Sequence, residues 1–439
     1  MKKHVRIIIG IALIAAIILA ASCSKKAPEV QTAAPAVVQA AAPATQQAPV
    51  VQQAATPAVV QTQTYADGIY YAADDAFGSS GWKEVVTLEV KGGKIVSVDW
   101  NAVHLNGGAD KKTHDKAGKY NMVAFGKAQA EWYQQAEKAE AYLLATQDPK
   151  KITYKDDQGH TDDIAGVSIH VNALFDLATE ALAAGPVGRG PYQDGAYVAV
   201  DGEYSSSGWK EYVALTVVNG RIASVNWSAI NKTGDDKKVY DKAGKYNMVA
   251  YGKAQAEWYQ QAEKAEAYLL ATQDPKKITY KDDQGHTDDI AGVSVHVNAL
   301  FDLAAEALAA GPTTLGSYAD GGYYASDAEF ANGWKGYVSL LVNNGNLVSV
   351  YWSALNEANE DKKVYDMAGK YNMVAYGKAQ AEWYQQAQKA EAYLLDTQST
   401  SKITFKDEAG HTDDIAGVSI HVGDFYALVD QALKAGPKK

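Results

Sequence analysis

The stretch TDDIAGVSIHV at residues 161–171 returns as TDDIAGVSVHV at 287–297 and as TDDIAGVSIHV at 412–422. Its serine moves from Ser168 to Ser294 to Ser419, which are steps of 126 and 125 residues. Solenoid repeats are only about 20–50 residues long, whereas a unit of this length can bury its own core. The sequence therefore predicts three complete domains in tandem.

The same spacing sets the limits of the three units. We expect them at residues 65–186, 192–312 and 318–437, joined by short links. Within the first unit, residues 67–71 form a short strand, and the alternating runs 82–90 and 95–100 flank Gly92-Gly93 as a hairpin. The other units place Asn-Gly at this turn, which is a strong hairpin signal.

Helical periodicity follows the hairpin. Residues 121–146 contain no proline, and Trp132, Ala136, Ala139 and Leu143 form one apolar stripe, so we expect a long helix there. A strand over 152–155 and a short helix over 172–184 complete the unit. Asparagine opens that helix in the first two units and aspartate does so in the third (Asn172, Asn298 and Asp424), as expected of N-caps. Each unit is thus predicted to be α+β: a small, mostly antiparallel sheet with one long and one short helix.

The N-terminus reads as a targeting segment. Residues 1–22 combine three positive charges with an apolar run and small residues, which predicts a secretory signal. The single cysteine of the chain, Cys23, follows directly and resembles the lipidated cysteine of a bacterial lipobox, although the leucine stands four residues before it rather than three. The alternative is ordinary secretion with one spare thiol. Residues 23–64 are rich in Ala, Pro and Gln and predict a disordered tether.

Composition narrows the range of functions. The net charge of the chain is −11, and it becomes more negative without the charges of the leader, so nucleic acid is not an expected partner. With Cys23 used for a lipid, no cysteine is left for a disulfide or an iron–sulfur cluster. Two histidines per unit recur, His160 and His170 in the first, but their spacing matches no common metal motif, and we expect no metal site.

Each recurring serine lies between a glycine and the start of a helix, where unpaired backbone N–H groups favour phosphate. A serine needs activation to act as a nucleophile, and no hydrolase motif surrounds these three. From the residues alone, a structural serine at a strand-to-helix corner competes with a phosphate-bearing one. We expect no catalytic residues of the chain's own.

The whole unit resembles the FMN-binding domain family, in particular the repeated form found in bacterial lipoproteins of flavin-based extracellular electron transfer. The resemblance rests on the DG-x-Y opening, GWKEVVTLEVKGGKIVSVDW, KAGKYNMVA, QAEWYQQAEKAEAYL and D-x-x-A-G-V-S, in the same order in all three units apart from small substitutions. In that family a separate flavin transferase joins FMN through a phosphoester to the last hydroxyl of a D-x-x-S/T-G-A-S/T motif. Here the hydroxyl belongs to serine where threonine is usual, and valine precedes it where alanine is usual.

The resemblance implies up to three covalent FMN groups, on Ser168, Ser294 and Ser419. It also implies that the transferase recognises the three aspartates, and the glycines let the phosphate approach the backbone (Asp162, Asp288, Asp413, Gly166, Gly292 and Gly417). Four aromatic side chains of the first unit are candidates to stack on the flavin ring: Trp82, Trp100, Tyr120 and Trp132. His170 is expected near the phosphate.

The function implied is that of an electron carrier, not an enzyme, held by lipid on the outer side of a cell membrane. Its expected partners are the flavin transferase, a membrane quinol-linked dehydrogenase as donor, and an external acceptor or reductase. A repeated adhesin or ligand-binding array without flavin, in which repetition supplies avidity, is the alternative. A purely structural surface protein is the third possibility.

Overall fold

The computed structural model describes residues 64–438. The expected leader (residues 1–22), Cys23 and all of the expected tether except Thr64 lie outside the described residues. Within the described part, no helix is both long enough and apolar enough to cross a membrane. The described residues form one compact unit, and the same order of elements occurs three times within it.

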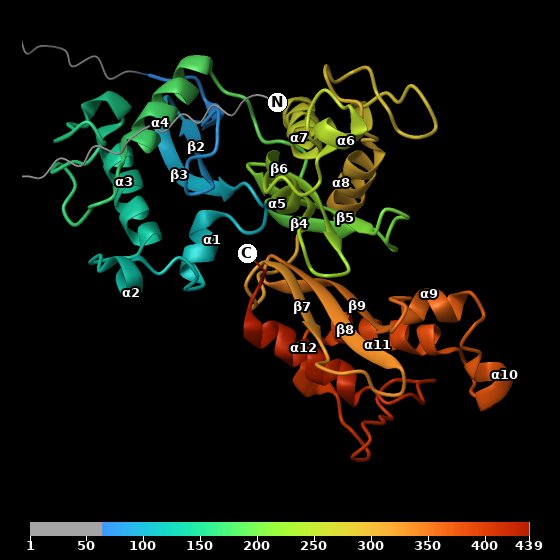
Figure 1. Cartoon of the computed structure of the whole chain (residues 1–439). Helices are drawn as coiled ribbons and strands as arrows, with labels where there is room; N and C mark the ends of the chain where they lie inside the picture. The colour runs from blue at the N-terminus through green and yellow to red at the C-terminus, as the bar shows by residue number, and fades with distance from the viewer. Residues whose placement is uncertain (1–63, 439) are drawn as a thin grey trace, which may run out of the picture. The chain divides into compact units, whose positions relative to one another are not determined.

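Each repeat contains three strands, two short helices, one long helix, a 3-10 turn and a final helix (Figure 1). The first repeat consists of β1 (Gly68–Ala73), β2 (Trp82–Lys91), β3 (Lys94–His104), α1 (Lys111–Lys116), α2 (Met122–Gly126), α3 (Trp132–Thr146), η1 (Pro149–Lys151) and α4 (Asn172–Ala184).

The second repeat consists of β4 (Gly195–Val200), β5 (Trp209–Val218), β6 (Arg221–Asn231), α5 (Lys237–Lys242), α6 (Met248–Gly252), α7 (Trp258–Thr272), η2 (Pro275–Lys277) and α8 (Asn298–Ala310). The third consists of β7 (Gly321–Ser326), β8 (Trp334–Asn343), β9 (Asn346–Asn356), α9 (Lys362–Met367), α10 (Met373–Gly377), α11 (Trp383–Thr397), η3 (Thr400–Lys402) and α12 (Gly423–Ala435). The predicted α+β class and the three tandem units are confirmed.

Each sheet is a three-stranded antiparallel meander whose strands lie in chain order: β1-β2-β3, β4-β5-β6 and β7-β8-β9. The predicted hairpin is present, with Val86 opposite Trp100 and a register shift at Glu89/Val90. In the second repeat, Asn219 and Gly220 both have positive φ, at 53° and 70°, as a two-residue hairpin turn of this kind requires. The sequence signal and the turn geometry therefore agree.

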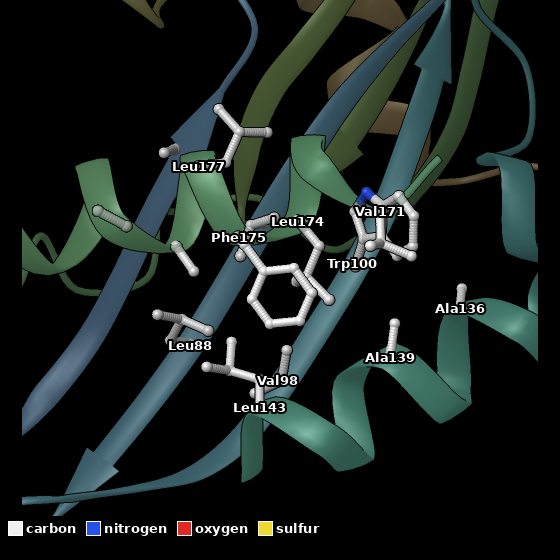
Figure 2. Packing of buried hydrophobic residues seen from close by; sticks show 14 of the residues in the cluster. Leu88, Val98, Trp100, Ala136, Ala139, Leu143, Val171, Leu174, Phe175 and Leu177 are labelled. Atoms are coloured by element: carbon white, nitrogen blue, oxygen red, sulfur yellow. The ribbon is translucent and has the colours of Figure 1, made fainter. Parts of the chain in front are cut away.

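The core lies between one face of the sheet and the two main helices. Figure 2 shows the apolar side of α3, with Ala136, Ala139 and Leu143, meeting residues of α4 and the sheet. These three side chains are fully buried, as is the apolar side of α4 around Leu174 and Phe175. The stripe predicted from sequence is the face that makes this core.

The long helix also seals the open edge of the sheet. β3 is an edge strand, so the backbone N–H groups on the side that faces away from β2 have no neighbouring strand to pair with. The Glu140 carboxylate accepts a hydrogen bond from Trp100 N at 2.6 Å, and the Gln147 side chain bonds both Ile95 N and Ile95 O at 2.9 Å. The equivalent residues of the other repeats, Glu266 with Gln273 and Glu391 with Gln398, make the same bonds.

The opposite faces of the sheets are covered by neighbouring repeats. Val85 and Val103 form a small buried cluster with Val218 and Ala223, and Thr216 Oγ1 donates to Gly108 O at 2.8 Å. A second cluster joins the second and third sheets. This explains why the second half of β5 is buried at every position, whereas a sheet with one solvated face shows alternation.

The long helical stretch predicted over residues 121–146 is broken. Asn121 and Lys127, at the two ends of α2, have left-handed φ angles of 58° and 53°. Glu131 ends the break because its side chain accepts from Met122 N at 2.7 Å and joins Gln134 in a capping box at the start of α3. The absence of proline is compatible with a continuous helix over this stretch, but the Glu131 carboxylate binds the backbone at the start of α2 and the helix is interrupted.

Two local predictions near α4 were also wrong. Residues 152–155 are not a strand, since side chains take the backbone partners of Thr153: Asp163 accepts from its N–H and Thr161 donates to its oxygen, both at 2.7 Å. The N-cap of α4 is Val171, not Asn172, whose side chain packs against Gly159. Val297 and Val422 likewise take the N-cap positions predicted for Asn298 and Asp424.

We predict that Glu140→Ala lowers the free energy of unfolding by about 3 kcal/mol, because it leaves buried Trp100 N unpaired and leaves the Lys112 ammonium with only the partly exposed Asp99. The control is Glu137→Ala on the same helix. It breaks only the half-exposed Lys116–Glu137 pair and should cost less than about 1 kcal/mol. Urea unfolding of the full chain measures both, and equal losses in the two variants would contradict the assignment.

Candidate functional site

The recurring serine lies in a loop between η1 and α4. Ser168 is exposed and stands four residues before the first residue of α4. The loop has no strand or helix of its own, so side-chain hydrogen bonds give it its shape. Ser294 and Ser419 occupy the same position in the second and third repeats and are also exposed.

A buried glutamine of the long helix holds each serine. Gln135 is 1% exposed, and its Oε1 accepts from Ser168 N at 2.7 Å and from Ser168 Oγ at 3.2 Å. Its Nε2 donates to Ala130 O at 2.9 Å, which fixes the orientation of the amide. With the hydroxyl proton directed at Gln135, the lone pairs of Ser168 Oγ are left for an incoming group.

This clamp is the same in all three repeats. Gln261 holds Ser294 and Gln386 holds Ser419, again at 2.7 Å to the nitrogen and 3.2 Å to Oγ. An amide oxygen orients a hydroxyl but does not remove its proton. The chain therefore positions the serine oxygen, and a base that activates it has to come from elsewhere.

A lysine one turn further along α3 places a positive charge beside the serine loop. Lys138 Nζ donates to Gly166 O at 3.2 Å. Gly166 has φ of 73°, and a Cβ at this position would stand 2.6 Å from that Nζ, so the loop needs glycine here. Lys264 and Lys389 make the corresponding contacts with Gly292 and Gly417 at 3.4 and 3.5 Å.

An oriented hydroxyl with a free lysine charge nearby fits a phosphate ester. The lysine ammonium has three donors, of which the glycine oxygen uses one, so it can also bind a phosphate oxygen. The glycine leaves the backbone open to a bulky group. By this test, the residues present suit the phosphate end of a nucleotide such as FMN.

The two aspartates of the motif have different roles. Asp163 is structural, because its carboxylate accepts from Thr153 N at 2.7 Å and its N–H bonds Thr161 Oγ1. Asp162 has a side chain 81% exposed that pairs only with the exposed Lys155 at 3.1 Å. Asp288 and Asp413 are equally exposed and have equivalent lysine partners. The predicted aspartate is therefore the accessible one of the pair.

The recurring histidines pack on each other. The rings of His160 and His170 meet edge to face with centroids 4.3 Å apart, and His160 Nδ1 bonds the Asp156 carboxylate at 2.6 Å. The other repeats repeat both contacts. Within residues 64–438, no cluster of three or more His, Cys, Asp or Glu side chains is arranged to hold a metal ion.

Three of the four aromatic side chains proposed to stack on a flavin surround a lysine. Lys111 Nζ lies 4.2 Å from the ring centroid of Trp132, 5.2 Å from that of Tyr120 and 5.9 Å from that of Trp82. Trp100 is buried behind them, edge to face with Trp132. We call Lys111 with Trp82, Tyr120 and Trp132 the lysine cage. Its cation–π contacts stabilise a charge that is almost fully buried.

The cage of the third repeat lacks the carboxylate that the first possesses. Lys111 Nζ is 3.4 Å from Glu84, whereas Gly336 stands at the matching position beside the third-repeat lysine, Lys362. Lys362 lies among Trp334, Tyr371 and Trp383, at 5.4, 4.5 and 4.5 Å. Burial lowers the pKa of Lys362 to about 8, and Asp366 opposes this only in part.

Gln135 and Lys138 lie in the segment QAEWYQQAEKAEAYL, on which the family resemblance partly rests, but neither was predicted from the sequence to have a role at the site. The available signal was a polar Gln-x-x-Lys pair at i and i+3, which places both side chains on one face of α3. That this face meets the serine loop depends on a contact between residues 33 positions apart.

Comparisons with known proteins identify similar solved structures but no named family. No family model matches the chain, and no curated protein matches it. A structural genomics target from Clostridium thermocellum, solved by solution NMR, is 59% identical over 27% of this chain and 90% of its own, with a TM-score of 0.23. A Clostridium perfringens protein solved by crystallography is 22% identical over 28% and 88%, also with a TM-score of 0.23.

We predict that Lys362 is acetylated faster than surface lysines at pH 8, because much of it is then the neutral, nucleophilic amine. Its rate should rise with pH through about 8 and level off above. Gly336→Glu restores the carboxylate of the first repeat and should move that rise to higher pH, since a nearby negative charge favours the ammonium. Competitive labelling read by mass spectrometry tests this. A profile unchanged by Gly336→Glu would show that the missing carboxylate is not the cause.

Proposed function

We propose that the chain is an electron carrier in which FMN is joined by a phosphoester to Ser168, Ser294 and Ser419. The observation that supports this most directly is the threefold clamp, in which a buried glutamine orients an exposed serine hydroxyl at the same distances in every repeat. A structural serine at a corner has no need of an exposed, oriented oxygen. The family resemblance of the sequence supplies the identity of the group.

The residues of each repeat have separable tasks in this proposal. When the transferase breaks the phosphoanhydride bond of an activated flavin nucleotide, a nucleoside monophosphate leaves, and the serine Oγ gives its proton to a base of the transferase and becomes the bridging oxygen of the phosphoester. Lys138 compensates the phosphate charge in the first repeat. Asp162 is accessible to the flavin transferase that makes the bond. The bound flavin takes up and releases electrons, and the protein supplies its position and its electrostatic surroundings.

The proposal extends to the place of the chain in the cell. A lipid on Cys23 holds the three flavin domains on the outer side of a membrane. Electrons enter from a quinol-linked dehydrogenase in that membrane and leave to an external acceptor or reductase. Covalent attachment suits such a place, because an exported protein cannot replace a cofactor that dissociates.

We predict that Ser168→Ala removes one FMN per chain and that alanine at all three serines removes every one. The chain is produced together with a flavin transferase, and intact mass and the fluorescence of the denatured band are measured. Ser168→Thr should keep the group, since threonine has the same hydroxyl, and Ser97→Ala, at an exposed strand serine, is the control. A triple-alanine chain that still fluoresces after denaturation would overturn the proposal, and a flavin-free wild-type chain would favour a ligand-binding array.

We also predict that Gln135→Leu slows loading of Ser168 by about tenfold, because it removes the hydrogen bond that orients Ser168 Oγ, worth roughly 1 kcal/mol or somewhat more, together with the bonds to Ser168 N and Ala130 O. Ser294 and Ser419 in the same molecule are the internal controls, since Gln261 and Gln386 are untouched. Peptide mapping over a time course gives the three rates separately. Equal rates at all three serines would show that the clamp has no part in attachment.

A further inference from the structure

A cavity of about 470 Å³ opens beside the lysine cage of the first repeat. Its lining comes from the first repeat, from the segment at residues 315–320 that leads into the third, and from Asn344 of the third repeat. The lining residues on which the argument rests are Trp82, His104, His114, Lys119, Tyr120 and Asp320. Cavities of this size hold small organic molecules of two or three rings.

Two of these residues occur in the first repeat only. His104 corresponds to Asn231 and Asn356, and His114 corresponds to Tyr240 and Tyr365. The sequence therefore repeats the serine site three times but not this pair of histidines. Neither imidazole belongs to the recurring His160–His170 pair.

The first repeat is also shaped to admit His104. A Cβ at Gly81 would stand 2.6 Å from His104 Nε2, and Gly81 has φ of 80°. At the matching Gly208 and Gly333, an added Cβ meets nothing within 4 Å. The imidazole thus fills space that the other two repeats leave open.

Aromatic edges form one wall of the cavity. Trp82 meets three rings edge to face: His104 at 5.0 Å, His114 at 5.7 Å and Tyr120 at 6.2 Å between centroids. Such a wall contacts a flat ring over a large apolar area at little cost in side-chain entropy, because the rings already hold one another.

Polar groups form the other wall, and their charges balance. Lys119 Nζ donates to Tyr318 O at 3.1 Å, and Asp320 Oδ1 accepts from Gly345 N at 2.7 Å. Burial lowers the pKa of His104 and of His114, which favours the neutral imidazoles, and it raises the pKa of Asp320. One ammonium, one carboxylate and two neutral rings suit a ligand with polar atoms and no net charge.

We propose that this cavity binds an uncharged, flat aromatic compound of two fused rings that carries ring carbonyl or hydroxyl groups, of the quinone and hydroquinone class. The aromatic wall takes the ring faces and edges, and the Lys119 ammonium, which has donors left beyond its bond to Tyr318 O, bonds a ring oxygen. There is one such site per chain, on the first repeat. The proposal concerns binding and does not depend on flavin.

The experiment is calorimetric titration of the full chain, made without flavin transferase, with dimethylnaphthoquinone. Both open positions of the quinone ring of this probe are methylated, so it does not add to thiols or amines. We expect one site per chain. Dimethylnaphthalene, with the same shape but no oxygens, should bind at least about fivefold more weakly.

The matched variant is the double substitution His104→Asn with His114→Tyr, which installs the residues that the second and third repeats have at these positions. Affinity for the probe should fall at least about tenfold, as the tyrosine fills the cavity and both imidazoles are lost. Tyr365→His, at the corresponding position of the third repeat, should leave the affinity unchanged. Thermal unfolding of each variant checks that the fold is kept.

Unchanged affinity in the double variant, three sites per chain, or no binding of the probe would each overturn this inference. The flavin content of the same variants, measured on chain made with the transferase, gives a separate result. If the cavity does not bind the probe, the proposed attachment of FMN to serine is unaffected. If the chain carries no flavin, the proposed cavity site is unaffected.

Discussion

The arrangement of each repeat depends on one buried carboxylate on its long helix. Glu140 Oε1 accepts from Lys112 Nζ at 2.5 Å and from Trp100 N at 2.6 Å, so it ties α3 to α1 and to the edge strand β3 at once. Burial raises the pKa of Glu140 in spite of Lys112. A charge buried in this way is tolerated because both of its partners are held by the surrounding structure.

The geometry of the serine site depends on these contacts of Glu140. Gln135 and Lys138 lie on α3 within about a turn and a half of Glu140, so fixing the helix against the sheet also fixes where these two side chains point. The serine loop has little regular structure and depends on them, through bonds to Ser168 and Gly166. A shift of the helix along the strand would move the clamp away from the hydroxyl.

The serine site has the same geometry in all three repeats, whereas its surroundings differ. The clamp distances agree in all three repeats, yet the lysine cage has a carboxylate neighbour in the first repeat and none at the matching Gly336 of the third. The first repeat alone has His104 and His114 beside its cage. Three similar domains thus present three different electrostatic environments, and under the proposed function this would give the three flavins different reduction potentials.

Much of the fold could be predicted from local patterns. The triplication, the hairpin with its Asn-Gly turns, the apolar stripe of α3 and the span of α4 all follow from spacing and periodicity, which are properties of neighbouring residues. The recurring serine was also found from the repeat spacing, whereas the role of the aspartate was implied only by the family resemblance. The predicted continuous helix over 121–146, the strand over 152–155 and the Asn172 cap were wrong, because side chains such as Glu131 and Asp163 took the backbone partners that regular structure would have used.

The sequence by itself determined that there are three domains and which hydroxyl recurs in each. Only the tertiary structure decided that Gln135 and Lys138 meet that hydroxyl, that the tryptophans surround a lysine, and that a first-repeat cavity closes against residues 315–320. The physical reason is the separation along the chain of the residues that make each contact. A turn or a helix face is set by residues a few positions apart, whereas these contacts join residues that are between 21 and 199 positions apart in the chain and meet only once the core is packed.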